Sequence, residues 1–480
     1  MKTFRVLVAV GVLALVGRAS GQTLTNLYSF TGHEDGDVPL AGLIQGSDGN
    51  FYGTTIFGGY VTGGAVPSGY GTVFRISPNG SMARIYAFSG AYATPSDGDD
   101  PNAPVIQGRD GNFYGTTLYG GTGPSDADDG CGIVFRVSPA GVETNLYSFP
   151  YYVNGGFPTA GLVQGYDGNF YGTTSSGGAY AYSGGSFGTV FRISPSGVLT
   201  TLYSFSNSPS DGAVPSQLGL VQGSDSNLYG TTQGVSWWTG NATGTVFRIS
   251  PSGVFTNLYS FLGQSNGYFP NGGLVQGTDG NFYGTTGYGG TNGGYGTMFR
   301  ISPTGTFTSV HSFSQSDGEG PSALVLGSDG NFYGITGAGG AYSNGTVFRI
   351  SASGSLTVLQ SVVSAPAFNG LMQGSDGNFY GTTQQGGTYS NGSVFRFAIP
   401  LNPPANQISA VQSAGSNAVL TVPSVAGETY QLQFSPSMNP TNWSNVAGVC
   451  VSNSIGAALT VTNFGGATGA QGFYRFAITP

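Results

Sequence analysis

The chain has 480 residues, enough for more than one domain, and only 7% of them are charged. Twenty-one acidic residues against 13 basic ones give a formal net charge of −8 at pH 7. An acidic protein with a single lysine, Lys2, is poorly suited to bind nucleic acid or an anionic membrane surface, so we expect neither partner.

The first 21 residues have the pattern of a secretory signal peptide. A basic start with Lys2 and Arg5 is followed by an apolar run over 6–17 and by the small residues Ala19 and Gly21. The run is shorter than the about 20 apolar residues that span a bilayer, and we predict no membrane span elsewhere. Cleavage would leave ten arginines against 21 acids, and we expect the mature protein to be exported, either extracellular or on the cell surface.

A repeat dominates the sequence between 22 and 399. Gly-Ser-Asp-Gly-Asn-Phe-Tyr-Gly-Thr-Thr at 46–55 returns in edited form at 108–117, 165–174, 223–232, 277–286, 327–336 and 374–383. Each copy precedes a short apolar run that ends in an arginine, namely Arg75, Arg136, Arg192, Arg248, Arg300, Arg349 and Arg396. A period of roughly 50–60 residues with only strand and turn signals is typical of a β-propeller.

The third copy indicates how one unit folds. Its strand-like runs are 160–164, 170–174, 189–193 and 198–205. Asp167-Gly168 suits a tight turn between the first two runs, and Pro195 suits the turn between the last two. We therefore predict an all-β fold of four-stranded blades.

The ends of the repeat predict a closed ring of seven blades. Leu24–Phe30 is a copy of the fourth strand that comes before any first strand, and the seventh unit stops after its third strand at Phe397. The N-terminal strand would complete the last blade and leave no exposed sheet edge between the first and last blades. After a linker at 400–405, residues 406–480 alternate in strand-like runs, for which we predict a small β-sandwich.

Two kinds of connection distinguish the faces of the predicted disc. The turns after the first and third strands are short and repetitive. The loops after the second strand, and the connections from each blade to the next, vary in length and sequence. We call the side that carries them the variable face. Binding residues gather on variable loops of rigid scaffolds, so we expect the ligand site there.

Aromatic residues recur in the loops of the variable face. Such rings on small-residue loops suit the face of a sugar or the surface of a protein. We predict a ligand-binding set at Trp237, Trp238, Tyr180, Tyr182, Tyr60 and Tyr70, with further rings at Tyr119, Tyr288, Tyr295, Tyr342 and Tyr389. The alternative is that these rings pack on one another as covers over the blades.

Two polar columns recur in every unit. The aspartates of the first turn are Asp48, Asp110, Asp167, Asp225, Asp279, Asp329 and Asp376. They share one end of the blade with the seven repeat arginines, so we predict an ion pair in each blade, for example Asp167 with Arg192, rather than a ligand ring. A second motif, Asp/Asn-Gly-x-x-Pro, recurs in six connections between blades and favours a turn role.

One place is unusually acidic. Asp97, Asp99 and Asp100 precede the second blade, and Asp126, Asp128 and Asp129 lie in its long loop. Six carboxylates at one site repel each other unless a cation binds, and oxygen ligands suit calcium, so we predict calcium as the one candidate cofactor. A solvated pair of acidic loops is the alternative.

The sequence contains no nucleophile elbow, zinc spacing or phosphate loop. Of the two histidines, His33 has no evident partner and His311 stands where other units have tyrosine. We predict a protein that binds a glycan or another protein through the variable face. The alternatives are a carbohydrate-active enzyme, glycosidase or lyase, which would use loop acids such as Glu34, Asp37 and Glu319, and a structural envelope protein.

Three linked motifs carry a family resemblance. They are Gln-Gly-x-Asp-Gly-Asn-Phe-Tyr-Gly-Thr-Thr, Gly-Thr-Val-Phe-Arg-Ile-Ser-Pro-x-Gly and Leu-Tyr-Ser-Phe. Over about 24–397 the chain resembles the GloVer-type (choice-of-anchor) tandem-repeat proteins of exported bacterial origin. The resemblance implies export and frequently a sorting signal, which is not visible in this sequence, and it implies no activity for any residue. The first motif is loosely similar to repeats of streptogramin-lyase-like and sensor propellers, which implies shared fold rather than shared chemistry.

Overall fold

The computed structural model describes residues 23–59, 69–90, 97–122, 130–150, 154–181, 186–234, 244–362 and 368–399, and six strands between 410 and 479. In this part of the chain the regular elements are strands, apart from one short 3-10 turn, η2 (Gln264–Asn266). No helix in these segments is long and apolar enough to cross a membrane. The predicted signal peptide lies outside the described residues.

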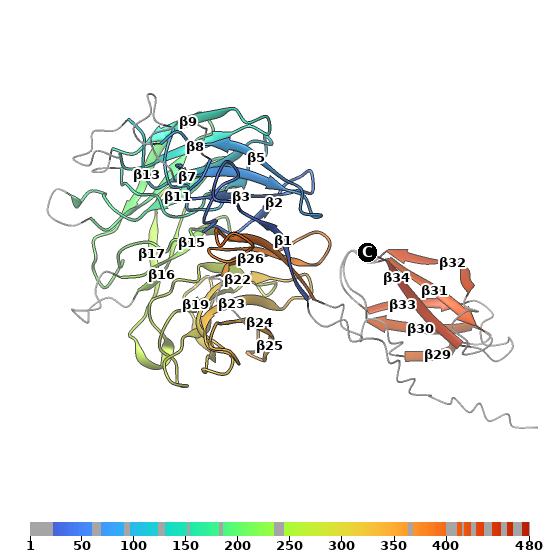
Figure 1. Ribbon diagram of the computed structural model, residues 1–480. Coiled ribbons are helices and arrows are strands. Elements are labelled where there is room, and N and C mark those ends of the chain that lie inside the picture. The colour runs from blue at the N-terminus through green and yellow to red at the C-terminus, as the bar shows by residue number, and fades with distance from the viewer. Residues whose placement is uncertain are drawn as a thin grey trace, which may run out of the picture.

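Seven four-stranded antiparallel sheets form the blades of a propeller (Figure 1). Blade 1 contains β2 (Ile44–Gln45), β3 (Phe51–Thr55), β4 (Thr72–Ile76) and β5 (Met82–Ala87). Blade 2 contains β6 (Ile106–Gln107), β7 (Phe113–Thr117), β8 (Ile133–Val137) and β9 (Glu143–Ser148). Blade 3 contains β10 (Val163–Gln164), β11 (Phe170–Thr174), β12 (Thr189–Ile193) and β13 (Leu199–Ser204). Blade 4 contains β14 (Val221–Gln222), β15 (Leu228–Thr232), β16 (Thr245–Ile249) and β17 (Phe255–Ser260).

The remaining blades follow the same order. Blade 5 contains β18 (Leu274–Gln276), β19 (Phe282–Thr286), β20 (Thr297–Ile301) and β21 (Phe307–Ser312). Blade 6 contains β22 (Glu319–Leu326), β23 (Phe332–Ala338), β24 (Thr346–Ile350) and β25 (Leu356–Ser361). Blade 7 contains β26 (Phe368–Gln373), β27 (Phe379–Thr383), β28 (Ser393–Ala398) and the N-terminal strand β1 (Thr23–Ser29). Neighbouring first strands contact each other, which places them at the centre and the fourth strands at the rim.

The predicted closure of the ring is confirmed. β1 pairs antiparallel with β28, from Thr23 opposite Ala398 to Ser29 opposite Ser393. Figure 1 shows the blue N-terminal strand beside the orange strands of blade 7. The first and last blades are thereby joined without a free sheet edge between them.

The second strand of each blade is buried on both faces because it lies between two neighbouring blades. In β3 all five residues of Phe-Tyr-Gly-Thr-Thr are buried. Its glycine, Gly53, allows the close approach of its neighbours, since a Cβ there would lie 2.7 Å from the Phe74 ring and 2.9 Å from Leu43. The repeated glycine therefore serves packing.

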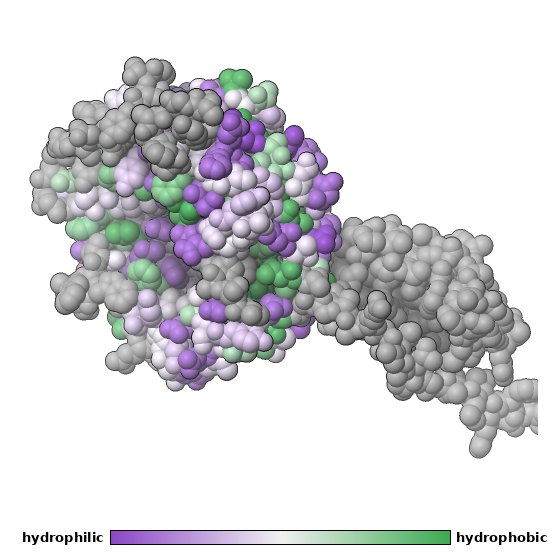
Figure 2. All heavy atoms as spheres, viewed as in Figure 1, coloured by the Kyte–Doolittle hydropathy of each residue, from purple (hydrophilic) through white to green (hydrophobic). Residues whose placement is uncertain are grey.

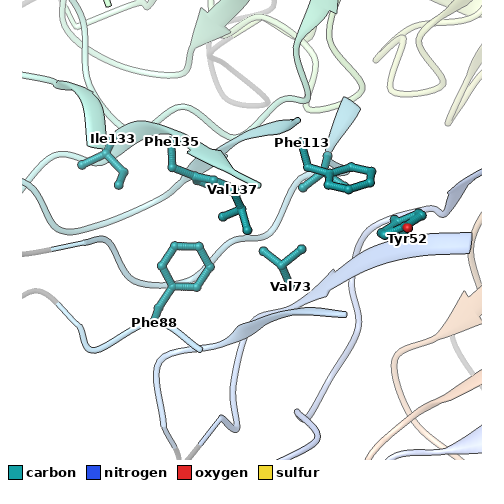
Figure 3. Packing of buried hydrophobic residues seen from close by; sticks show 8 residues of the cluster. Tyr52, Val73, Phe88, Phe113, Ile133, Phe135 and Val137 are labelled. Carbon is teal, nitrogen blue, oxygen red and sulfur yellow. The ribbon is translucent and has the colours of Figure 1, made fainter. Parts of the chain in front are cut away.

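The hydrophobic core is divided into seven clusters, one between each pair of blades. Figure 3 shows the cluster between blades 1 and 2, built from Tyr52, Val73, Phe88, Phe113, Ile133, Phe135 and Val137. At six interfaces the tyrosine ring of a second strand packs, stacked or tilted, on the phenylalanine ring of the next blade, with ring centroids 3.9–4.3 Å apart. At the seventh, Leu228 stands where the phenylalanine would be, beside Tyr171.

A ring of glutamines links the blades at the end of their first strands. The six members are Gln45, Gln107, Gln164, Gln222, Gln276 and Gln373. Each amide donates to a carbonyl in its own first turn at 3.0–3.1 Å. Each accepts a backbone N–H from the preceding blade at 2.8–3.0 Å. In blade 6 the position is Leu326, so the ring is interrupted once.

Replacing one glutamine of this ring should weaken the propeller. We expect Gln222→Leu to lower the free energy of unfolding by about 1 to 2 kcal/mol, because the hydrogen bond from Tyr166 of the preceding blade and the bond to Ser226 in its own turn are both lost. The exposed Gln217 of the same blade is the matched control, and Gln217→Leu should stay within about 0.5 kcal/mol of the unmodified protein. Denaturant unfolding measures both, and equal stabilities would contradict a linking role for the ring.

The C-terminal segment contains two three-stranded sheets. One has the order β29 (Ala410–Ala414), β30 (Asn417–Pro423), β33 (Ala458–Asn463), and the other β32 (Ser444–Ser452), β31 (Thr429–Ser435), β34 (Phe473–Thr479). The strand content agrees with the all-β prediction. A β-sandwich made from these sheets, with its boundary at 406, stays a prediction.

Candidate functional site

Both ends of the propeller chain lie on the face opposite to the variable face. Thr23, where β1 begins, is paired with Ala398, where β28 ends. This end of blade 7 corresponds to the tight turn that joins third to fourth strands in the other blades. The first and last described residues of the propeller strands therefore lie away from the variable face.

The Asp/Asn-Gly-x-x-Pro motif of the variable face builds a repeated turn. In the connection from blade 3 to blade 4, Asp211 accepts hydrogen bonds from the Tyr203 hydroxyl at 3.0 Å and from the Ser206 amide at 2.8 Å. Asp317 accepts in the same way from His311, at 2.9 Å. A Cβ on Gly155 would lie 2.2 Å from the Thr174 hydroxyl. The predicted turn role and the structural role of His311 both agree with these contacts.

The predicted ion pair between Asp167 and Arg192 is wrong. The Tyr171 hydroxyl donates to Asp167 at 2.7 Å, and Asn169 donates to the same carboxylate at 2.8 Å. Arg192 lies opposite Tyr171 across the two strands, so the tyrosine separates arginine from aspartate. Among the described residues, the one ion pair within 4.0 Å is that of His311 with Asp317.

Asp167, Tyr171 and Arg192 influence one another's electrostatics, with the tyrosine between the two charged groups. Burial raises the pKa of Asp167, but hydrogen bonds from Asn169 and Tyr171 and the charge of Arg192 bring that pKa below its usual value. Burial and Asp167 raise the pKa of Tyr171, and Arg192 partly opposes this rise. The seven aspartate–tyrosine hydrogen bonds repeat at 2.6–2.9 Å and account for the aspartate column without a ligand.

In four blades the described part of the loop between second and third strands lies against the fourth strand. Backbone amides of these loops donate to serines of the outermost strand at 3.0–3.3 Å, from Ala179 to Ser204, Thr291 to Ser312, Ala341 to Ser361 and Thr388 to Ser29. Tyr180, 44% exposed, is close enough to Tyr203 to affect its pKa. This ring therefore lies at the rim rather than over the centre.

The other predicted aromatic residues divide into two groups. Tyr70 is partly buried and packs against the core cluster between blades 1 and 2, which matches the alternative that it acts as a cover. Tyr60, Tyr182, Trp237 and Trp238 lie outside the described residues. The prediction for these four is unchanged.

Of the six predicted calcium ligands, Asp97, Asp99 and Asp100 lie in the described residues and the other three do not. Both carboxylate oxygens of Asp97 accept hydrogen bonds from Ser89 and Tyr86 within its own turn. Burial raises the pKa of Asp100, and Asp99 opposes this through a side-chain hydrogen bond. Asp126, Asp128 and Asp129 lie outside the described residues. In the segments that the structure describes, no three or more acidic, histidine or cysteine side chains are arranged to hold a metal.

Two aromatic groups on the variable face each join a ring predicted from the sequence, Tyr288 or Tyr119, to rings that were not predicted. Tyr268 and Tyr288 stack with centroids 5.5 Å apart, and Phe269 lies 6.1 Å from Tyr288. Between blades 2 and 3, Tyr119 and Phe157 meet edge to face at 5.8 Å. Three of these residues occupy the variable positions inside the Asp/Asn-Gly-x-x-Pro motif. Variation within a constant turn was the signal that could have identified them.

The two faces of the propeller differ in charge. The described connections of the variable face carry Glu34, Asp35, Asp37, Asp97, Asp99, Asp100, Asp211, Asp317 and Glu319. Arg84 is the arginine that reaches them, donating to the Glu34 carbonyl at 2.9 Å. On the opposite face the seven turn aspartates are balanced by the seven repeat arginines and Arg109. On the side in view in Figure 2, hydrophilic and hydrophobic residues are interspersed over the propeller.

Glu143 is a carboxylate in an otherwise apolar column. The equivalent residues Phe255 and Phe307 stack on Tyr203 and Tyr259 of the preceding blade at 4.0 and 3.9 Å. One carboxylate oxygen of Glu143 is buried without a hydrogen-bond partner. Burial and the nearby charge of Asp97 raise the pKa of Glu143 to about 7.

Glu143 should make stability fall as pH rises. Its pKa is about 7 in the folded protein against a usual 4.5, so folding favours the protonated acid. The loss of folding stability caused by ionisation of Glu143 is absent below pH 4.5, grows between pH 4.5 and 7, and is complete above pH 7. We expect a loss of about 1 to 2 kcal/mol after allowance for solvent screening. Thermal unfolding of the protein and of Glu143→Gln across this range measures it, and parallel curves would exclude this contribution.

A sequence model of the Gloeobacter/Verrucomicrobia repeat family matches residues 17–241 and 218–417. Among solved structures, the chain is similar to a streptogramin B lyase, with 16% identity, 78% of this chain and 98% of the lyase covered, and a TM-score of 0.52. It is similarly close to a catalytically inactive virginiamycin B lyase from Staphylococcus aureus with quinupristin, at 15% identity, 79% and 100% coverage and a TM-score of 0.52. At these identities the likeness concerns the fold. No curated protein matches the sequence.

Proposed function

The chain belongs to the Gloeobacter/Verrucomicrobia repeat family, and we propose that it is an exported propeller that binds a glycan or a protein through its variable face. The repeated residues of the blades already have structural partners: aspartate with tyrosine, glutamine with the neighbouring turn, and ring with ring. What differs from blade to blade is concentrated in the connections of the variable face. This contrast is the observation that carries the proposal.

The aromatic group of blade 5 is the best-defined contact surface for such a ligand. Tyr288 is 37% exposed, and Tyr268 and Phe269 are partly exposed beside it. Stacked rings with hydroxyl groups offer an apolar face and polar edges together, which suits both a pyranose ring and a protein side chain. The surrounding acids disfavour anionic ligands such as nucleic acid, because like charges would be brought together.

Ligand screening with a matched pair of variants tests this proposal. The mature protein is applied to a glycan array and to a panel of candidate surface proteins, and each hit is measured again with Tyr288→Ala. The control is Tyr166→Ala, which removes a tyrosine that is 62% exposed on the opposite face. We expect Tyr288→Ala to weaken binding about tenfold, in line with the loss of one stacking contact, and Tyr166→Ala to leave it unchanged.

Other outcomes would redirect the assignment. Equal loss in both variants would move the binding site away from the aromatic group of blade 5. A glycan that is cleaved rather than retained would favour the alternative of a carbohydrate-active enzyme, with convergent carboxylates as the groups to find. Absence of any ligand would favour a structural envelope protein.

Calcium is proposed as an accessory ligand of the same face. Because Asp97 is held by its own turn, the site would rely on Asp99 and Asp100 together with Asp126, Asp128 and Asp129. Calorimetry should show a higher melting temperature with calcium than with a chelator, and the difference should disappear in Asp126→Asn/Asp128→Asn. A melting temperature that does not respond to calcium would remove the proposal.

A further inference from the structure

We infer that blades 6 and 7 carry a pair of equivalent binding sites for units of one neutral polysaccharide, each site centred on one exposed tyrosine, Tyr342 or Tyr389. This assignment rests on the proposed function and narrows the ligand from a glycan or a protein to an uncharged, repetitive glycan. Two equal sites on neighbouring blades suit a polymer, because a repetitive ligand can occupy both of them at once.

The loops between second and third strands are nearly identical in these two blades. Residues 339–345 read Gly-Gly-Ala-Tyr-Ser-Asn-Gly, and residues 386–392 read Gly-Gly-Thr-Tyr-Ser-Asn-Gly. In the other five blades the corresponding loops are longer and differ in sequence. Blades 6 and 7 are neighbours, since β22 contacts β26. The variable face therefore presents the same loop twice, in adjacent positions.

Backbone hydrogen bonds hold both loops in the same way. In each loop the last glycine donates to the first, Gly345 to Gly339 at 3.0 Å and Gly392 to Gly386 at 3.2 Å. The amide before each tyrosine donates to a serine of the outermost strand, Ala341 to Ser361 at 3.3 Å and Thr388 to Ser29 at 3.0 Å. The tyrosine side chains take part in none of these bonds, so the loops do not depend on the rings for their shape.

A residue in an unfavourable backbone conformation follows each tyrosine. Ser343 has a φ of +60° and Ser390 a φ of +64°, in the left-handed region that favours glycine. Non-glycine residues in this region gather at ligand sites, where the surrounding structure holds them in place. The two loops therefore repeat in backbone conformation as well as in sequence.

The two rings are exposed beside polar side chains of the outermost strand. Tyr342 is 56% exposed and Tyr389 is 57% exposed. The Tyr28 hydroxyl donates to Asp35 at 2.8 Å. Burial and Asp35 raise the pKa of Tyr28, and the nearby Tyr389 adds to this rise. In blade 6 the position of Tyr28 is taken by Gln360, another hydrogen-bonding side chain.

The composition of the loops favours a neutral glycan over a protein or a charged polymer. Neither loop contains a charged residue or a histidine, and acids of nearby connections, such as Asp37 and Glu319, disfavour anions. A stable protein interface buries about 1,200–2,000 Å² around an apolar core. Here each exposed ring is set among glycine, serine and asparagine. A sugar unit can stack on such a single ring and form hydrogen bonds at its edges.

Electrophoresis of the full chain in native gels that contain a soluble polysaccharide tests this inference. The probes are the neutral polymers laminarin, mannan, hydroxyethylcellulose and dextran, and the anionic polymer alginate is the charge control. We expect at least one neutral polymer to retard the protein and alginate not to retard it. The monomeric sugar of that polymer should bind at least about 100-fold more weakly, because joining two sites through one ligand raises affinity about 10²–10⁴-fold.

Variants of the two tyrosines show whether both sites take part. Tyr342→Ala and Tyr389→Ala should each weaken binding of that polymer about tenfold, and the double variant should weaken it about 100-fold. The double change to phenylalanine keeps both rings and should retain most of the binding. Tyr166→Ala, on the opposite face, is the matched control and should leave binding unchanged. Because these tyrosines are exposed, the melting temperature should not change in any variant.

Failure of this inference can be distinguished from failure of the proposed function. Unchanged polymer binding in the double alanine variant would overturn the pair of sites, and the proposed function would stand if Tyr288→Ala still weakened binding. Retardation by alginate, or tight binding of the monomeric sugar, would overturn the assignment of a neutral polymer. Binding of a candidate surface protein without retardation by any neutral polymer would also overturn it. Absence of every ligand would overturn both proposals.

Discussion

Deletion of residues 22–30 should lower the free energy of unfolding of the propeller by at least about 4 kcal/mol. The deletion removes β1 and Phe30, and truncation of one fully buried phenylalanine alone costs about 3 to 5 kcal/mol. It also leaves β28 as an unpaired sheet edge, which promotes association with other chains. Thermal unfolding and light scattering should show an early transition accompanied by aggregation.

A C-terminal truncation is the control for this deletion. A chain that ends at residue 405 keeps every strand of the seven blades. We expect its propeller transition to lie close to that of the intact protein. Unchanged stability after removal of 22–30 would contradict the role of β1 in closing the ring.

The second large effect is expected from Gly188→Ala. Gly188 has a φ of +90°, and a Cβ there would lie 2.2 Å from the Thr174 carbonyl oxygen and 2.9 Å from Pro215. The backbone conformation costs a non-glycine residue about 1 to 2 kcal/mol, and the steric conflict adds about 1 to 3 kcal/mol. Denaturant unfolding should therefore show a loss of about 2 to 5 kcal/mol.

Gly168 in the same blade separates these two contributions. Its φ is +84°, but a Cβ there would meet no heavy atom within 4 Å. Gly168→Ala should therefore cost only the conformational term of about 1 to 2 kcal/mol. If both variants lost the same stability, the close approach of Gly188 to Thr174 and Pro215 would not matter energetically.

Local signals were sufficient for the blade itself. Asp167-Gly168 and Pro195 mark turns through their own backbone preferences, and the runs between them show no helical periodicity. The closing role of Leu24–Phe30 followed from counting copies, because a fourth strand without a blade has only one sheet to join. These features depend on order along the chain, which a sequence states directly.

The interaction partners of side chains could not be predicted from the order of residues along the chain. Asp167 and Arg192 were placed at the same end of the blade, but Tyr171 comes between them because it lies opposite Arg192 and four residues from Asp167. The same limit applies to Tyr268 and Tyr288, which belong to two connections of the variable face. Their stacking depends on how those connections meet in space.

The sequence by itself determined the number of blades, the strands of each blade, the closure of the ring and the identity of the variable face, because these properties follow from repeated local preferences and from the circular offset of the repeat. Only the tertiary structure decided which polar groups satisfy one another and which aromatic rings remain exposed. Those outcomes depend on how residues meet in space, whether they are four positions apart, as Asp167 and Tyr171 are, or 330 apart, as Ser375 and Gln45 are where they meet across the closed ring at 2.8 Å.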